Sequence, residues 1–272
     1  MSDSAILYRG SISPAEAVDR LLVRLAGITR AEEMVTLEEA SGRVLAQDLV
    51  APANLPATNN AAVDGYAVDA AFLARHPDHE FPIAGRAAAG HPFTAPVPRG
   101  AVIRIFTGAV MPAGSDAVAM HEFCDLTKDG KQVRIGSVLE KGSNNRPAGE
   151  NLRQGEIIIA AGTRLDAANI AIAAAAGFDQ LVVHTRPVIG LLSMGDEIVP
   201  VGQLASYGQM HDSNRPMLAN MIRGDGFLLR DFGIIGDDPA QLARVLADAL
   251  PQDHDFGTRF VRGDGRAEAG TA

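Results

Sequence analysis

The chain of 272 residues contains a single cysteine, Cys124. One thiol excludes a disulfide within the chain and a cluster of thiolate ligands around one metal ion. A single cysteine is still compatible with a lone catalytic thiol. The histidines do not indicate zinc, because only His76 and His79 lie close together in the sequence.

Long apolar runs and an excess of basic residues are also missing. A bilayer-spanning helix needs roughly 20 apolar residues, whereas five charged residues fall within the first twenty. We therefore predict a cytoplasmic protein with no membrane partner. The formal net charge is −9, and nucleic-acid affinity comes mostly from clustered Lys and Arg. DNA and RNA are therefore not expected as partners.

The glycine patterns of common nucleotide-binding loops are absent as well. Neither GxGxxG nor a Walker glycine-lysine loop occurs, so a dinucleotide fold or an ordinary P-loop is not indicated. What is present is a chain with 47% hydrophobic residues. This length and composition allow buried cores and favour two domains or one large domain.

Capping patterns predict where several helices begin, including one at residues 167–176 that Asp166 caps and one at residues 239–250 that Asp238 caps. Residues 13–16 place a capping serine, a proline and a glutamate at the start of a helix that runs to about Gly27. Thr36 to Glu39 repeats the pattern and predicts a shorter helix that Gly42 ends. Residues 43–50 then have the composition of a strand.

Changes of composition predict the domain organisation. Residues 8–55 and 144–185 are expected to form a first domain of helices and strands. Residues 56–143, with short β-prone runs and many turns, predict a small β-rich domain inserted into it. In residues 186–255, strands and helices alternate, which predicts a parallel α/β domain. The charged residues 256–272 form an atypical tail.

That tail is too polar for the next strand of a parallel sheet, which is normally hydrophobic throughout. We predict a loosely attached or disordered segment there. The α/β domain would then be incomplete. A truncation or a change of reading frame after Asp255 is our hypothesis for this shift in composition.

Acidic residues follow a predicted parallel strand at 188–192, where open α/β sheets place their ligands. Asp196 and Glu197 come directly after this strand, and Asp212 opens the next helix. Such carboxylates suit Mg²⁺, and the three could share one ion. Asp212 also fits the role of a helix N-cap, which does not exclude ligand binding.

Three polar loops are further candidates. Asp64 precedes Gly65, Thr107 follows a predicted strand, and Glu150 lies in a loop rich in amide side chains. Tight backbone geometry can present such groups to an anion or a hydrated metal. An ordinary turn or linker has the same composition, so the residues alone leave both interpretations open.

Five blocks in sequence order resemble the molybdopterin molybdenumtransferase family, which also includes the E region of gephyrin. They are NNAAVDGYAV, IRIFTGAVMPAGSDAVAMHE, NRPAGENLRQGEIIIAAGTRL, RPVIGLLSMGDEIV and MHDSNRPMLANMI. Order and spacing agree over residues 10–255. Departures from the family's usual DNSAMDGYA and STGDE occur at Asn59, Ala61 and Met194. The family's next apolar strand and TSGGVS-like loop are replaced by the tail.

The resemblance implies a cytoplasmic homodimer that inserts molybdate into adenylylated molybdopterin, with Mg²⁺ assisting and AMP released. It also implies a molybdopterin adenylyltransferase as partner and an active site that spans two chains. The residues carried over are Asp64, Thr107 and Glu150 for catalysis, Ser193, Gly195, Asp196, Ser213 and Asn214 for the pterin, and Asp196, Glu197 and Asp212 for the metal ion.

Two alternatives remain open at this point. The first is a truncated, non-catalytic dimerisation or scaffold form of the same family, which the missing glycine-rich loop favours. The second is a hydrolase of sugar phosphates or nucleotides that uses Asp196 and Glu197 with Mg²⁺.

Overall fold

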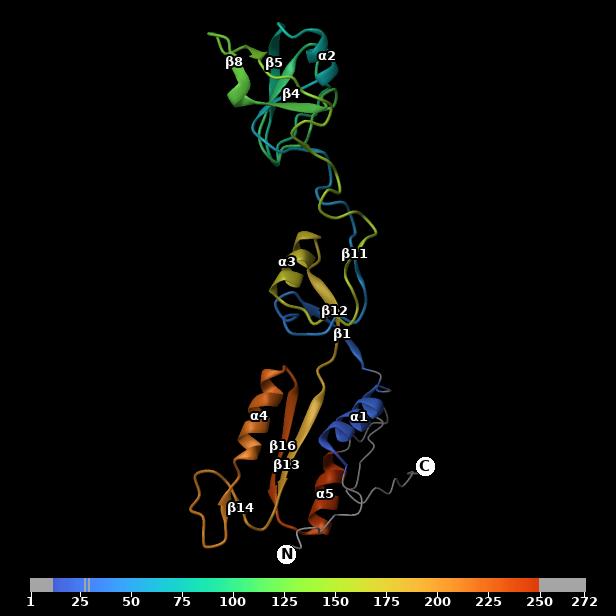
Figure 1. Ribbon diagram of the computed structural model, residues 1–272, viewed down its shortest axis with the longest axis vertical. Helices are drawn as coiled ribbons and strands as arrows, with labels where there is room; N and C mark the ends of the chain where they lie inside the picture. The colour runs from blue at the N-terminus through green and yellow to red at the C-terminus, as the bar shows by residue number, and fades with distance from the viewer. Residues whose placement is uncertain (1–11, 27, 29, 250–272) are drawn as a thin grey trace, which may run out of the picture. The chain divides into compact units, whose positions relative to one another are not determined.

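The computed structural model describes residues 12–26, 28 and 30–249 (Figure 1). The chain divides into two compact units, one of residues 34–182 and one that combines residues 1–33 with 183–272. The predicted tail at 256–272 lies outside the described residues. The finer domain boundaries expected from the sequence remain predictions.

A six-stranded sheet dominates the unit of residues 34–182. Its strands follow the order β7-β4-β6-β5-β9-β8, in which β5 and β6 are parallel and the other neighbours antiparallel. The elements are β4 (Gly65–Val68), α2 (Ala70–Arg75), β5 (Glu80–Ala87), β6 (Val102–Ile105), β7 (Ala117–Met120), the 3-10 turn η1 (His121–Phe123), β8 (Cys124–Leu126) and β9 (Gln132–Ile135). The β-rich texture expected for this region is thus confirmed.

The centre of this sheet is buried on both faces. Val102 belongs to one apolar cluster with Phe81, and Ile103 belongs to another with Ala87. All four are fully buried. Successive side chains of a strand point to opposite faces. Arg104 is two residues beyond Val102 and therefore lies on the same face of the sheet as Val102.

The short helix predicted for Thr36 to Glu39 is wrong. β1 (Glu32–Thr36) ends in a turn, in which the amide and hydroxyl of Thr36 donate to the Glu39 carboxylate at 3.1 and 3.0 Å. Only half of the expected capping arrangement forms, since the Thr36 hydroxyl donates to the carboxylate and does not accept from the Glu39 amide. Gly42, with φ of 74°, then follows too soon for a helix to propagate. The strand expected at residues 43–50 is reduced to β2 (Leu49–Val50) and isolated bridge residues at Val44 and Leu45.

Three short ladders and one helix complete this unit. β2 pairs with β11, β3 with β10, and β1 with β12. Their bounds are β3 (Asn60–Ala61), β10 (Asn145–Arg146), β11 (Ile157–Ile159) and β12 (Gln180–His184). Helix α3 (Ala167–Ala175) begins with a capping box between Asp166 and Asn169, and Gly177 follows it with φ of 93°. The helix predicted there is confirmed.

The second unit contains a β-α-β arrangement. β13 (Val188–Met194) and β16 (Leu228–Ile235) pair in parallel, and α4 (Asn214–Gly224) lies between them in the chain. Helix α4 packs against both strands, while α5 (Pro239–Ala249) packs on β16 from the other side (Figure 1). The predicted parallel α/β architecture is confirmed.

Smaller elements of this unit also follow local signals. Helix α1 (Pro14–Leu25) starts where expected, and the Ser13 hydroxyl oxygen accepts a hydrogen bond from the Glu16 amide at 3.1 Å. β14 (Ile198–Val199) and β15 (Met210–His211) form a short parallel pair between β13 and α4. In the described residues, no helix combines the length and apolar character that crossing a membrane would require.

Candidate functional site

The loops that follow β13 and β16 meet at one edge of the second unit, because the carboxyl ends of parallel strands lie side by side. The Gly195 amide donates to the Ile235 carbonyl at 3.1 Å. The Asp237 amide donates to Asp196 Oδ1 at 3.2 Å. Asp196 thus lies where the sequence places it, and its carboxylate joins the two strand ends.

Two glycines allow this close approach. A Cβ atom on Gly236 would lie 2.5 Å from Asp196 Oδ1, and one on Gly195 would lie 2.5 Å from Glu197 Oε2. Gly195 also has φ of 141°, a conformation that other residues rarely adopt. The carboxylates of Asp196 and Glu197 therefore occupy the space that a side chain at Gly236 or Gly195 would need.

Asp212 is the buried carboxylate of this edge, with 7% of its surface exposed. The Arg215 amide donates to its Oδ1 at 3.0 Å, so Asp212 caps the start of α4 as predicted. Ser213 occupies the formal N-cap position, but within the described chain its side chain makes no capping bond. Ser213 and Asn214 are exposed at the first turn, beside the strand end that carries Ser193.

The environment of Asp212 keeps this carboxyl ionised. The nearby Ser193 side chain lowers its pKa most, the amides of Arg215 and Asn214 and the Arg215 charge act in the same direction, and burial opposes them. The net effect is a pKa below the ordinary value of 3.8. Asp212 Oδ2 is nevertheless buried with no hydrogen-bond donor at normal distance among the described residues.

An ionised, buried oxygen without a donor is a suitable ligand for a cation. Mg²⁺ binds carboxylate oxygens and keeps several waters, so it does not need a complete set of protein ligands. Within residues 12–26, 28 and 30–249, no three or more His, Cys, Asp or Glu side chains gather closely enough to hold a metal ion. A Mg²⁺ ion shared by Asp196, Glu197 and Asp212 therefore stays a prediction, supported by Asp212 Oδ2.

The other group of candidate residues lies at the end of β6 in the first unit. The amide and the hydroxyl of Thr107 both donate to Asp64 Oδ1, each at 2.8 Å. These two bonds lower the pKa of Asp64 below its ordinary value of 3.8. Burial opposes them, and the charges of Arg104 and His121 lower the pKa further. The structure thus brings two of the predicted residues together around an ionised carboxylate.

Gly65, which follows Asp64, is a strand residue and not part of an Asp-Gly turn. It pairs with Met120 of β7 and Ile105 of β6. A Cβ atom at this position would overlap the backbone carbonyl of Ala119. The ordinary interpretation of this dipeptide as a turn is therefore wrong, since glycine is needed there for close strand packing.

Blocks that are distant in the sequence assemble around Asp64. The Gly108 amide donates to the Ala61 carbonyl and the Ala61 amide to the Ala109 carbonyl, both at 2.8 Å. The Ala62 amide donates to the Asn144 carbonyl at 2.9 Å. Backbone hydrogen bonds therefore join residues 59–67, 106–111 and 144–151 into one framework, although each segment alone has the composition of a loop.

Glu150 takes part in this framework through an ion pair. Arg146 Nε donates to Glu150 Oε2 at 2.7 Å, and Arg146 Nη2 donates to Asn151 Oδ1 at 3.1 Å. Both partners of the ion pair are partly exposed. Among the described residues Glu150 bonds to Arg146 rather than to Asp64 or Thr107, and its predicted catalytic role is not tested by this geometry.

The sequence interpretation missed three residues. Asp237 was overlooked because Asp238, its neighbour, was assigned as a helix cap; Asp238 Oδ1 does accept from the Ala240 amide at 2.9 Å. The strand-end rule applied to β16 as well as β13 would have found Asp237. Arg86 and Arg104 gave no usable signal, because their proximity depends on which strands become neighbours.

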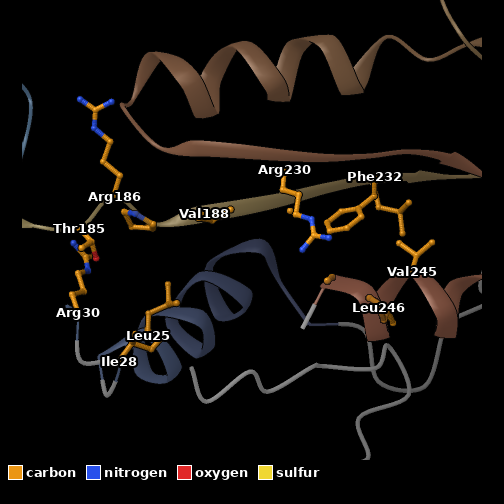
Figure 2. Close-up of a pocket in the computed structure, with 14 residues that line it drawn as sticks. Leu25, Ile28, Arg30, Thr185, Arg186, Val188, Arg230, Phe232, Val245 and Leu246 are labelled. Carbon is orange, nitrogen blue, oxygen red and sulfur yellow. The ribbon is translucent and has the colours of Figure 1, made fainter. Parts of the chain in front are cut away.

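A cavity of about 720 Å³ lies elsewhere in the second unit, between α1, α5 and the β13–β16 pair (Figure 2). Its walls are mostly apolar, with Leu25, Val188 and Phe232 among the lining residues. Arg230 lies over the Phe232 ring at 4.8 Å and pairs with Asp248 at 2.9 Å. None of the residues predicted as site residues lines this cavity.

A parallel β-α-β unit, in one chain with a β-rich region, defines a protein of the mixed α/β class. The match to known families is more specific. Residues 12–177 match the family described as the MoeA N-terminal region (domain I and II), and the chain belongs to this family. Residues 190–256 match the family described as a probable molybdopterin binding domain.

Curated relatives carry the name molybdopterin molybdenumtransferase. The protein from Synechococcus elongatus is 33% identical over 96% of this chain and 64% of its own length. The protein from Haemophilus influenzae is 31% identical over 87% of this chain and 58% of its own length. The chain thus spans about three fifths of the relatives that it matches. The resemblance found in the sequence blocks is confirmed.

Solved structures agree with this assignment. A crystal structure of the molybdopterin biosynthesis MoeA protein from Pyrococcus horikoshii matches 88% of this chain and 61% of its own, with a TM-score of 0.79 at 26% identity. A second structure of that protein gives a TM-score of 0.72 at 27% identity. The mixed fold, with a β-rich part and an α/β part, is therefore the fold of this family.

Proposed function

We propose that the chain acts in molybdenum cofactor biosynthesis and inserts molybdate into adenylylated molybdopterin with release of AMP. The observation that carries this proposal is the buried, ionised Asp212 with its free Oδ2, at a strand-end edge inside the region that matches a probable molybdopterin binding domain. The names of the curated relatives support it. Neither the scaffold nor the stand-alone hydrolase alternative draws support from them.

In this proposal the strand-end edge binds the pterin phosphates and a Mg²⁺ ion. Asp212 would hold the ion through Oδ2 with waters as further ligands. Asp196 and Glu197 do not form a three-carboxylate cluster with Asp212 among the described residues, so they would reach the ion through those waters. The bound ion would neutralise charge on the phosphate oxygens. At the start of α4, the exposed side chains of Ser213 and Asn214 offer a hydroxyl and an amide group to an anionic ligand. Ser193 and Gly195 would contact the pterin from the end of β13.

Asp64 has a different task because its lowered pKa keeps it ionised at neutral pH. It therefore accepts hydrogen bonds or attracts a cation, and it does not serve as a general acid. Thr107 fixes its orientation through two hydrogen bonds.

We further propose that the chain forms a homodimer in which Asp64 and Thr107 act on the α/β region of the partner. The cytoplasmic location, the catalytic role of Glu150 and the adenylyltransferase partner stay predictions.

The test follows molybdate-dependent release of AMP from adenylylated molybdopterin by the purified chain. Asp212→Asn removes the charge of the free oxygen and should lower the rate at least about tenfold, because a charged hydrogen-bonding or ligand group is lost. Asp129→Asn is the matched control, since Asp129 is also a carboxylate with a lowered pKa that accepts from a backbone amide, but in the β8–β9 turn. AMP release that is independent of molybdate, or equal rates for Asp212→Asn and the unchanged chain, would contradict the proposal.

A further inference from the structure

Two arginines share a face of the six-stranded sheet next to Asp64. Arg86 of β5 and Arg104 of β6 are register partners on parallel neighbouring strands, and such strands lie about 4.8 Å apart. Phe106 is two residues beyond Arg104 and therefore on the same face. Two positive charges and an aromatic ring thus form one patch, which is followed directly by Thr107.

Aromatic rings hold both guanidinium groups in place. Arg86 Cζ lies 4.6 Å and Arg104 Cζ 5.0 Å from the centroid of the Phe106 ring. Arg104 also lies over Tyr66 at 4.9 Å, and its Nη1 donates to the Gly65 carbonyl at 3.0 Å. A stacked guanidinium keeps most of its N–H donors free in its own plane. The rings therefore position the charges without consuming their hydrogen-bonding capacity.

These charges are not neutralised by ion pairs. In the part of the chain that the structure describes, neither Arg86 nor Arg104 forms an ion pair, and the Arg86 side chain donates no hydrogen bond. Asp64 interacts with the Arg104 charge through space, but its hydrogen bonds come from Thr107. The patch keeps a net positive charge, and a bound anion would relieve the repulsion between the two arginines.

We propose that Arg86 and Arg104, held by Phe106, bind a tetrahedral oxyanion beside Asp64 and Thr107. Paired guanidinium groups match the oxygens of such an ion, because their N–H donors form bidentate contacts in a fixed plane. The identity of the anion rests on the proposed function, in which two ligands share this chemistry. One is the phosphate of the adenylyl group, and the other is molybdate.

Calorimetric titration of the purified chain with AMP, and separately with molybdate, tests this site without any turnover. Arg86→Gln removes an exposed guanidinium and should weaken binding of at least one anion about tenfold, as expected for a charge-assisted hydrogen bond. Weaker binding of AMP alone assigns the site to the phosphate, and weaker binding of molybdate alone assigns it to that ion.

Two further variants separate a built site from general attraction. Arg99→Gln makes the same change of charge before the amino end of β6, at the far end of the strand from Phe106, and should change affinity less than about twofold. Phe106→Leu keeps both charges but removes the ring, and should weaken binding about threefold because the guanidinium groups lose their fixed positions. Thermal unfolding of each variant confirms that it is folded.

The proposal is overturned if the unchanged chain binds neither anion, if Arg86→Gln binds both with unchanged affinity, or if Arg99→Gln has the same effect as Arg86→Gln. These results test the anion site independently of the proposed function. A chain that releases no AMP but loses anion binding in Arg86→Gln retains the site and loses the enzymatic role. If the chain releases AMP but Arg86→Gln binds both anions with unchanged affinity, the enzymatic role is retained and the anion site is lost.

Discussion

Two carboxylates of this chain, those of Asp64 and Asp212, have their pKa values lowered by hydrogen bonds. Asp64 depends on the amide and hydroxyl of Thr107, and Asp212 depends first on Ser193 and then on the first amides of α4. Hydrogen bonds to the charged form lower a carboxyl pKa, whereas burial raises it. For both residues the hydrogen bonds prevail, which leaves a negative charge available at neutral pH.

Thr107→Val should raise the pKa of Asp64 toward 3.8, because the valine retains the amide donor but removes the hydroxyl donor. Carbon-13 NMR titration of the Asp64 carboxyl measures this shift. Thr127→Val provides the control, since the Thr127 hydroxyl bonds to Asp129 and the substitution should raise the pKa of that residue alone. An unchanged Asp64 titration in Thr107→Val would show that the hydroxyl bond does not form in solution.

Among the structural elements, the helices show best how local chemistry determines an outcome. Helices α1, α3 and α5 begin at residues 14, 167 and 239, where a capping side chain precedes them in the sequence. The first turn of a helix leaves four amides unpaired, and the capping side-chain oxygen accepts from one of them. The turn after Thr36 differs, because the Thr36 hydroxyl donates to the Glu39 carboxylate and does not accept from a backbone amide of the described residues. A sequence pattern for capping therefore does not by itself produce a helix.

Helix α4 permits a quantitative test of its cap. Asp212→Ala should destabilise the chain by about 1 kcal/mol at pH 7, because the Arg215 amide loses its acceptor. Ser213→Ala is the control, and it should change stability by less than about 0.5 kcal/mol, since the Ser213 side chain makes no capping bond among the described residues. Urea denaturation followed by circular dichroism measures both.

The effect of Asp212 should also depend on pH. Its pKa is lower in the folded chain than the ordinary 3.8, so the folded state binds fewer protons than the unfolded state. The stabilisation is present above pH 3.8 and is lost as the pH falls through the folded-state pKa. The difference between Asp212→Ala and the unchanged chain should therefore shrink toward about pH 3. A difference that stays constant across this range would contradict a role for the ionised form.

At the scale of the whole molecule, the candidate residues fall into two groups that belong to two compact units. Asp64 and Thr107 lie in the unit of residues 34–182, and Asp212 lies in the other unit. The proposed homodimer brings one group of each chain to the other group of its partner. A chain that carries a defect in one group would then be complemented by a chain defective in the other.

Mixing Asp64→Asn with Asp212→Asn chains tests this arrangement. Each variant alone should be inactive in AMP release, whereas random exchange should restore about a quarter of the activity, because half of the dimers are mixed and each mixed dimer has one intact site. Sedimentation equilibrium should give about twice the chain mass of 28.5 kDa. Activity of the mixture that equals the sum of the separate variants would place both groups of the site on one chain.

The sequence by itself determined the features that depend on neighbours within a few residues. Capping side chains and apolar periodicity predicted the helices that begin at residues 14, 167, 214 and 239, and alternating strands and helices predicted the parallel pair of β13 and β16. The ordered blocks predicted the family. Asp196 was also within reach, because a residue that follows a parallel strand lies at the ligand-binding edge wherever that strand packs.

Only the tertiary structure decided which of these residues meet. The contact of Asp237 with Asp196 spans 41 positions and that of Thr107 with Asp64 spans 43. The register of Arg86 with Arg104 depends on β5 and β6 becoming parallel neighbours. No local pattern encodes such pairs, because strand order is set by the packing of both faces of a sheet at once. The same residues in another strand order would leave Arg86 an ordinary surface arginine.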